Sequence, residues 1–129
     1  FDRLDQIVFG GIRQEDHQCW AMVPSMAPFL AYDQDRIIGY IYIDTEGALG
    51  PAAVERPDLL SPTISAAFET LAADHPAEVQ IRIPSAAREC LDFLISAHFG
   101  SITEIRLLLT SCEFGLFDRY LFSGADALL

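Results

Sequence analysis

Hydrophobic residues recur at helical spacing near the start of the chain, and this spacing predicts two short helices. Leu4, Ile7 and Val8 repeat at helical spacing in the first helix, which should end at the Gly10–Gly11 pair. The second helix should begin near residues 14–16, because the two acidic residues there suit a helix N-terminus, and should run toward Pro24. Both helices are expected to precede the first strand.

Alternating apolar positions then predict three extended segments between residues 28 and 54. Two short turns separate them, at residues 33–35 and 44–47, where Asp and Gly residues favour tight reversals. The middle segment places two groups of side chains on opposite faces: Ile37, Gly39, Ile41 and Ile43 on one, and Ile38, Tyr40 and Tyr42 on the other. Because both groups are apolar or aromatic, this segment should be a central strand of an antiparallel meander, covered on two sides.

The second half of the chain alternates between helical and extended patterns. Ser61 followed by Pro62 predicts a helix start, with Ser as the N-cap and Pro at the first helical position, and this helix should end near residues 74–76. The expected elements after it are a strand at residues 78–83, a helix opened by Pro84 and Ser85 that stops around residues 98–100, a long strand at residues 102–110 and an irregular tail with an aromatic cluster. We therefore expect an α/β (α+β) domain in which helices flank a mixed, mostly antiparallel sheet.

Length and charge limit the class of protein. A chain of 129 residues forms one domain, and no apolar run approaches the roughly 20 residues of a membrane span. The net charge of −11 comes from 19 acidic residues against eight basic ones, all of them Arg. Such a surface repels nucleic acids and anionic membranes and favours a cationic partner. We therefore expect neither a nucleic acid nor a membrane as a partner.

The cysteines and the first residues bear on the location and extent of the protein. Cys19, Cys90 and Cys112 are odd in number and widely spaced among apolar neighbours, which argues against a disulfide framework and for a reducing cytoplasm. Cys19, beside Trp20, is expected to be a buried thiol. The first residues are acidic and lack the pattern of a signal peptide, and the chain begins with Phe1, so we expect it to be the C-terminal part of a longer polypeptide.

The order of the elements, together with several segments, resembles one enzyme superfamily. These segments are IIGYIYI, ALGPAAV with the helix after it, VQIRIP, and the helix that ends in HF. They resemble the GNAT superfamily of acyl-CoA-dependent N-acetyltransferases over nearly the whole chain. FGGIRQEDHQCW and the closing FDRYLFSGADALL narrow the resemblance to the degenerate C-terminal domain of tandem-GNAT bacterial proteins. The resemblance implies a GNAT-like acyl-CoA N-acyltransferase fold for residues 1–129, beside an N-terminal GNAT domain that keeps the acetyl-CoA motif.

The resemblance also implies where acetyl-CoA would bind. In an active member, free backbone groups of a strand hold the pantetheine arm and the acetyl carbonyl, and a Gln/Arg-x-x-Gly-x-Gly/Ala loop cradles the pyrophosphate. Aligned with this motif, Arg56 takes the place of the basic residue, and Leu59 and Ser61 take the places of the glycines. Arg56 and the small Ser61 are therefore the candidate cofactor-binding residues. Asp58 adds a charge that repels a diphosphate, and two prolines in the connection remove N–H donors.

No catalytic residue carries over from the family. Its second helix often has an Asn near the start and a Tyr, four residues before a Gly-Phe pair, that serves as general acid. Here Ala87 and Leu94 take these places, and His98–Phe99 takes the place of the Gly-Phe pair. The His residues show no metal-ligand spacing, so no metal site is expected and the catalytic residues stay unknown.

Alternative interpretations stay open for several side chains. Tyr40 and Tyr42 can line a substrate cleft, but paired strand aromatics pack more often against a helix. The Glu-Asp-His run at residues 15–17 fits a helix N-terminus better than metal or acid–base chemistry. Arg56 can meet a phosphate or pair with a neighbouring acid, and the sequence favours neither. Tyr120 is expected to pin the C-terminus onto the sheet by aromatic packing.

Three functional hypotheses follow. In the first, the parent protein acetylates a small-molecule or peptide amine, and this domain is its degenerate half. It then supplies an interface, to the N-terminal GNAT domain or in a homodimer, or one wall of the acceptor site. In the second, the domain itself transfers the acyl group of acetyl-CoA, using backbone N–H groups between Gly50 and Val54 and a water as proton relay. The third is a ligand-binding or dimerisation module without catalysis.

Overall fold

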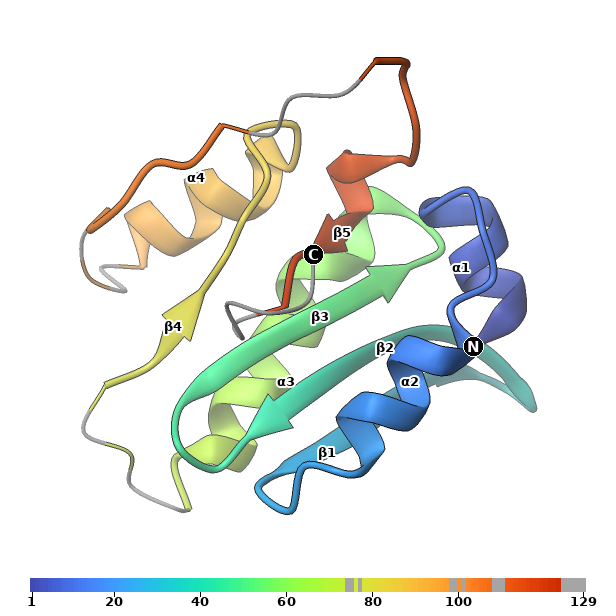
Figure 1. The fold of residues 1–129 in the computed structure, drawn as a ribbon. Helices are drawn as coiled ribbons and strands as arrows, with labels where there is room; N and C mark the ends of the chain where they lie inside the picture. The colour runs from blue at the N-terminus through green and yellow to red at the C-terminus, as the bar shows by residue number, and fades with distance from the viewer. Residues whose placement is uncertain (74–75, 77, 98–99, 101, 108–110, 124–129) are drawn as a thin grey trace.

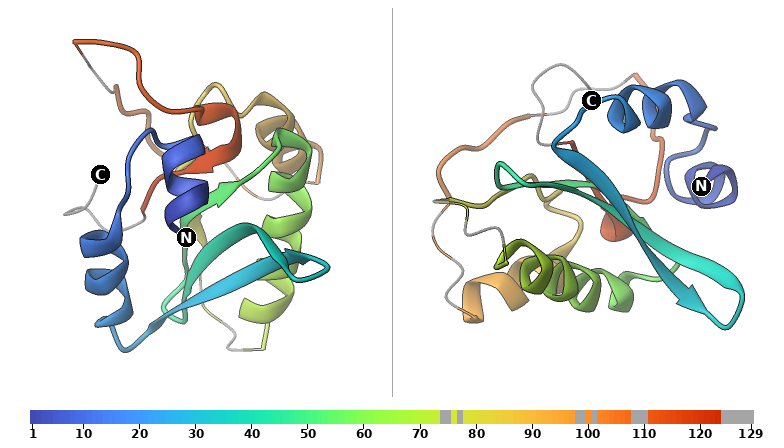
Figure 2. Two further views of the ribbon diagram at one scale, coloured as in Figure 1. Left: turned by 90° about the vertical axis from the view of Figure 1, so that its right-hand side faces the viewer. Right: turned by 90° about the horizontal axis from the view of Figure 1, so that it is seen from below.

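Helices cover both faces of a five-stranded sheet (Figure 1). A computed structural model describes the chain except for residues 74–75, 77, 98–99, 101, 108–110 and 124–129. The helices α1 (Asp2–Val8) and α2 (Gln14–Ala21) lie on one side of the strands. On the other side lie α3 (Leu60–Leu71) and α4 (Arg88–Ser96) (Figure 2, right).

The first three strands form the antiparallel meander that the sequence predicts. β1 (Met26–Asp33) pairs with β2 (Arg36–Asp44), and β2 pairs with β3 (Ala48–Val54), each time in the antiparallel sense. β4 (Gln80–Ile81) lies parallel to the start of β3. The prediction of a mixed, mostly antiparallel sheet flanked by helices is therefore confirmed.

The core is divided into two clusters by the sheet. On the side of α3 and α4, Ile41 and Ile43 of β2 pack with an apolar stripe of α3 that includes Ile64. On the side of α1 and α2, Tyr40 and Tyr42 pack with Leu4, Val8, Trp20 and Met26. All four of these β2 side chains are buried, so the prediction of a central strand covered on two sides is confirmed.

An irregularity in β2 changes the direction of one predicted side chain. Ala31 pairs with Gly39, whereas the next residue, Tyr32, pairs with Ile37, so the pairing skips one residue of β2. Such a bulge reverses which face the following side chains occupy. Ile37 consequently packs with the cluster under α1. The prediction that it shares a face with Ile41 was wrong.

The helices of the second half begin elsewhere than predicted. A 3-10 helix, η1 (Pro57–Leu59), leads directly into α3, whose N-cap is Leu59. The predicted cap at Ser61 was therefore wrong, because the preceding turn already starts the helical path at Pro57, whose fixed φ suits a first helical position. α4 begins at Arg88 and not at Pro84–Ser85. β4 covers only the middle of the strand predicted at residues 78–83.

The end of the chain differs most from the prediction. Residues 102–107 have no regular structure, so the predicted strand is wrong there, and its remaining residues, 108–110, lie outside the described part. Within the segment predicted as an irregular tail, η2 (Phe117–Arg119) leads into β5 (Tyr120–Leu121), which pairs antiparallel with β3. The expected packing of Tyr120 is confirmed, because its ring is fully buried against Phe9, Phe117 and Phe122.

Candidate functional site

The connection between β3 and α3 holds the two residues predicted to bind a cofactor. Arg56 immediately precedes η1, and its Nε and Nη2 donate to the two carboxylate oxygens of Asp58 at 3.1 and 3.0 Å. These hydrogen bonds hold the pKa of Asp58 below its usual value, because they stabilise the ionised carboxylate. Ser61 lies in the first turn of α3. The Arg56 guanidinium is thus engaged by Asp58 rather than by Ser61.

The same connection leaves few backbone donors for an anion. Leu59 N donates to Arg56 O at 3.1 Å, and Leu60 N donates to Pro57 O, so η1 uses N–H groups that a helix N-terminus would otherwise present. Pro57 and Pro62 have no N–H. A diphosphate at this position would therefore find little of the backbone cradle that such sites use.

The backbone of β3 is paired on the side where β4 departs. β4 pairs with β3 at Ala48 and Leu49, and beyond them Ala52 and Ala53 pair with β5. Phe122 N, in turn, donates to Arg82 O at 3.2 Å, so the chain that follows β5 lies between β3 and the residues after β4. The strands do diverge after Leu49, and residues 120–122 occupy the gap.

A close approach in this gap requires glycine. Gly50 has a φ of +115°, and a Cβ at that position would lie 2.4 Å from Phe122 O. Any larger residue would push the tail away from β3, because backbone atoms cannot yield as a flexible side chain can.

The positions that match the family's second-helix residues are apolar and buried. Ala87 caps α4, and Leu94 lies in its last turn; both pack in the cluster that includes Cys90 and α3. Neither offers a group that can transfer a proton. His98–Phe99, which match the Gly-Phe pair, lie outside the described residues.

A second group of polar side chains lies beneath α1 and α2, and the sequence did not predict it. The carboxylate of Asp5 is fully buried. The Tyr40 hydroxyl donates to its Oδ1 at 2.6 Å, and His17 Nε2 lies 2.7 Å from its Oδ2. His17 Nδ1 lies 2.8 Å from the Tyr42 hydroxyl. We call these four residues the Asp5–His17 cluster.

Aromatic rings enclose this cluster. The rings of Phe1, Trp20, Tyr40 and Tyr42 have their centroids 4.5 to 5.7 Å from that of His17. The alternation of β2 places both tyrosines on this face, and a buried tyrosine hydroxyl needs a partner. That requirement was the only signal in the sequence, and it does not identify Asp5 or His17 as the partners.

Arg13 extends the polar region toward the C-terminal segment. Its guanidinium lies over the rings of Phe9 and Trp20, at 4.2 and 4.8 Å from their centroids. It also donates to Asp16 Oδ2 at 2.7 Å and to the Tyr120 hydroxyl. Burial raises the pKa of Tyr120 to about 12, against the opposing effect of Arg13. Arg13 thus joins the start of α2 to β5.

The connectivity of the Asp5–His17 cluster is that of a proton relay, because a carboxylate orients an imidazole whose other nitrogen meets a hydroxyl. Its environment does not suit catalysis. Tyr42 is only 2% exposed, and burial, with the nearby Asp5, raises its pKa to about 12. A nucleophile or general base requires access and a lowered or matched pKa. The cluster fits the role of fixing two helices to the sheet, and the prediction that Tyr40 and Tyr42 pack in the core is confirmed.

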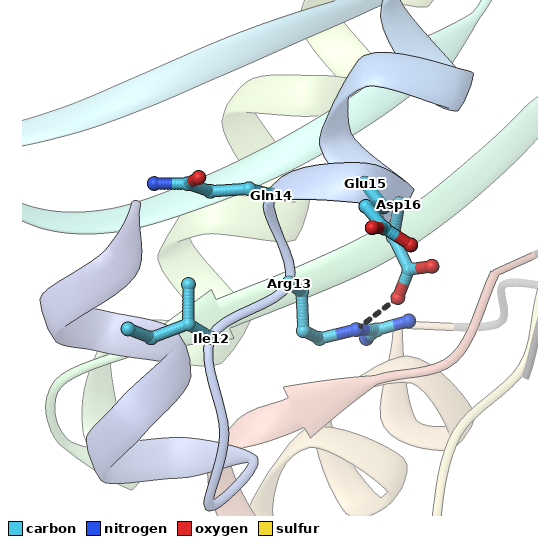
Figure 3. A pocket seen from close by; sticks show the side chains of 5 residues that line it. All are labelled: Ile12, Arg13, Gln14, Glu15 and Asp16. Carbon is cyan, nitrogen blue, oxygen red and sulfur yellow. Dashed lines mark hydrogen bonds and ion pairs between the residues drawn. The ribbon is translucent and has the colours of Figure 1, made fainter.

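An open pocket of about 340 Å³ lies at the start of α2, lined by Ile12, Arg13, Gln14, Glu15 and Asp16 (Figure 3). The guanidinium of Arg13 is paired with Asp16, so the lining carries an excess of acid. Within the described residues, no three or more His, Cys, Asp or Glu side chains are grouped so as to hold a metal.

The environments of two cysteines differ from each other. Cys19 is exposed, so the prediction of a buried thiol was wrong: Trp20 is the buried residue of α2, and adjacent positions of a helix point in different directions. Cys90 is buried, and burial raises the pKa of its thiol to about 11.

Comparisons with known proteins give no family for this chain. No family model matches it, and no match was found among curated proteins or solved structures. Of the helices in the part that the structure describes, none combines the length and the apolar composition required to cross a bilayer.

Proposed function

We propose that this chain is a GNAT-like domain that forms the non-catalytic half of an N-acetyltransferase acting on a small-molecule or peptide amine. In this proposal it is the C-terminal part of a longer cytoplasmic polypeptide, and the N-terminal GNAT domain binds acetyl-CoA. The element order from β1 to α4 supports the proposal, because the meander, helix, parallel strand and helix occur in the order that the resemblance implies. The acidic surface suits an amine acceptor.

The pairing of β3 with β5 is the observation that carries the non-catalytic part. In an active member, free backbone groups of this strand would hold the pantetheine arm. Here Ala52 and Ala53 already pair with Leu121 and Tyr120. The candidate residue Arg56 is held by Asp58, so acetyl-CoA binding to this domain would require both interactions to be given up.

Calorimetric titration with acetyl-CoA tests the non-catalytic role. We expect no heat of binding at millimolar ligand for this chain or for its Arg56→Ala variant. Micromolar binding that is lost on Arg56→Ala would instead favour a domain that is itself an enzyme. Replacing Leu59 and Ser61 by Gly restores the motif's glycines; because β5 still occupies β3, we expect this variant not to bind either.

Assay of the longer polypeptide tests the parent activity. We expect acetyl transfer from acetyl-CoA to a primary amine that is unchanged by Arg56→Ala in this domain. A longer polypeptide that acetylates no amine, or whose activity disappears with Arg56, contradicts the proposal.

A further inference from the structure

The C-terminal part of the fold is joined to the rest by a long irregular connection. α4 ends at Ser96 and η2 begins at Phe117, and the described part of residues 97–116 contains no helix or strand. The connection follows the outside of the molecule before the chain returns to β3 (Figure 1). We call residues 97–116 the linker and residues 117–123 the C-terminal segment. A terminal segment on such a linker can dock on its own chain or on a second copy.

The contacts that hold the C-terminal segment come from earlier parts of the chain, which we call its seat. β5 pairs with β3, and Tyr120 is fully buried. Arg82 Nη1 donates to Ser123 O at 3.0 Å. Arg119 Nη1 donates to Glu55 O at 3.0 Å. The same segment of a second copy can make all of these contacts, and this holds equally if the chain continues a longer polypeptide.

The middle of the linker carries apolar side chains that the single chain does not bury. Ile102, Ile105 and Leu107 are 65%, 83% and 86% exposed. The sequence pattern predicts a strand here, but of the strands that the structure describes none pairs with residues 102–107. Exposed apolar side chains grouped in this way indicate an interaction surface. This part of the linker therefore lacks the partner strand that its sequence favours.

We propose that two copies of this chain exchange their C-terminal segments, and that the two linkers pair antiparallel where they cross. The segment of each copy then fills the seat of the other, and the contacts between β5 and β3 are conserved. Exchange alone adds no contact, so the pairing of the linkers is what favours the dimer. This dimer involves no acetyl-CoA site and so goes beyond the proposed acetyltransferase role.

The charges of the linker select a second copy as its partner. When two antiparallel copies of residues 103–107 are centred on Ile105, Glu104 of each copy lies opposite Arg106 of the other. Opposite charges at directly opposed positions stabilise a strand pair, and like charges destabilise it. A partner strand of uniform charge would meet a like charge at one of these two positions. Ile105 and Leu107 lie on the other face, where the apolar side chains of the two linkers meet.

Two electrostatic costs of this dimer are small. In the single chain Arg106 Nε lies 3.0 Å from Glu104 Oε1, and both side chains are exposed, so little is lost when each exchanges its partner for the equivalent one. The net charge of −11 opposes association of two copies. At physiological ionic strength, however, salt largely screens exposed charges that are more than about 8 Å apart, whereas the charges of the linkers are in direct contact.

Sedimentation velocity after refolding at micromolar to millimolar concentration tests the dimer. We expect Ile105→Glu to weaken association at least about tenfold, because it brings two like charges together where the linkers cross. Glu104→Arg should also weaken association, and the double variant with Arg106→Glu should restore it. These three positions are exposed, so the fold is expected to be kept. Ile95→Glu, at an exposed position of α4, is the matched control and should leave association unchanged.

Disulfide trapping tests the exchange of the C-terminal segment. Ala52 and Leu121 are opposed across the β3–β5 pair, so a cysteine at each position can join the segment to its seat. Chains with Ala52→Cys are refolded together with chains with Leu121→Cys, and we expect a covalent dimer that contains one of each. Ile95→Cys in place of Leu121→Cys measures the background from the exposed native cysteines. A chain with both Ala52→Cys and Leu121→Cys shows whether the disulfide can form.

Several results would overturn the proposal. One is a chain that stays monomeric at millimolar concentration. Another is a dimer that Ile105→Glu and Glu104→Arg leave unchanged, that Ile95→Glu weakens equally, or that the double charge reversal does not restore. Cross-linking of the mixed chains at the background level, while the double-cysteine chain closes its disulfide internally, overturns the exchange. Failure of the double-cysteine chain to form any disulfide contradicts the seat itself.

Discussion

The two faces of the sheet show two ways of filling a core from one alternating strand. Toward α3 and α4, Ile41 and Ile43 join a cluster held by the packing of apolar side chains. Toward α1 and α2, Tyr40 and Tyr42 present hydroxyls that meet Asp5 and His17. The first face relies on burial, which has no preferred direction, whereas the second adds hydrogen bonds that require particular atoms at particular distances.

This difference shows why the polar face needs its exact residues while the apolar face needs mainly volume. α1 and α2 are short, with seven and eight residues, and helices of that length are not stable alone in water. The Asp5–His17 cluster joins both of them to β2. Losing one member therefore leaves buried polar groups without partners, whereas a smaller apolar residue beneath α3 leaves only a cavity.

Removing the buried carboxylate should have the largest effect. We expect Asp5→Ala to lower the free energy of unfolding by about 3–5 kcal/mol, because it leaves the Tyr40 hydroxyl and His17 without their shared partner. Urea unfolding followed by circular dichroism measures the change. Asp2→Ala, on the same helix but at the surface, is the matched control and should change little. Equal effects of the two substitutions would show that the cluster adds nothing to stability.

Substitutions that remove one heavy atom should distinguish the two faces of β2, because the effects of two such substitutions combine differently on each face. We expect Tyr40→Phe and Tyr42→Phe each to cost about 1–3 kcal/mol, because each leaves a buried partner unsatisfied. Their effects should not add, since both hydroxyls belong to one network. Ile41→Val and Ile43→Val, on the opposite face of the same strand, pack in one cluster but share no hydrogen bond, so we expect a smaller coupling between them than between the two tyrosines. Additive tyrosine effects in a double-mutant cycle would contradict the interpretation of the four residues as a unit.

The sequence predicted the elements in which apolar residues repeat at regular spacing, and it missed the elements that have no such repeat. β2 was recognised as doubly covered because seven successive positions alternate between apolar groups. β5 has only two residues, too few for any alternation, and its position depends on the gap that β4 leaves beside β3. Arg56–Asp58 pairing was among the alternatives because the two residues are neighbours in the chain.

The Asp5–His17 cluster could not be predicted for a related reason. Its members come from three elements, and the pairing of a helix-initial acid with a histidine twelve residues later has no repeating pattern. Ser61 followed by Pro62 is a strong local signal for a helix start, yet the preceding 3-10 turn overrides it. The types of adjacent residues predicted the structure correctly where contacts between neighbours in the sequence determine it. They misled where contacts between distant segments determine it.

Alkaline pH should weaken the polar face. The pKa of Tyr42 is about 10 when unfolded and is raised to about 12 by burial, so folding favours the protonated phenol. This contribution is complete below pH 10 and is lost as the pH rises toward 12, with about 1.4 kcal/mol lost by pH 11. Urea unfolding at pH 8 and at pH 11 measures it.

Two variants measure the shares of Tyr42 and Cys90 in the alkaline loss, to which Tyr120 also contributes because burial raises its pKa to about 12 as well. Tyr42→Phe should lose less stability than the parent chain between the two pH values. Cys90→Ala on the apolar face is the necessary comparison, because burial also raises the pKa of that thiol, to about 11. If Cys90→Ala abolishes the alkaline loss of stability and Tyr42→Phe leaves it unchanged, the loss comes from the apolar face. That result contradicts the prediction for Tyr42.

The smallest effect is expected from an ion pair outside both cores. Arg56 and Asp58 are exposed and solvent screens their attraction, so Arg56→Ala should leave the urea midpoint unchanged within error. Arg13 also pairs with an aspartate, but its guanidinium is buried over Phe9 and Trp20, and Arg13→Ala should lower the midpoint clearly. A measurable loss of stability in Arg56→Ala would contradict this prediction. It would mean that the β3–α3 connection depends on the Arg56–Asp58 pair.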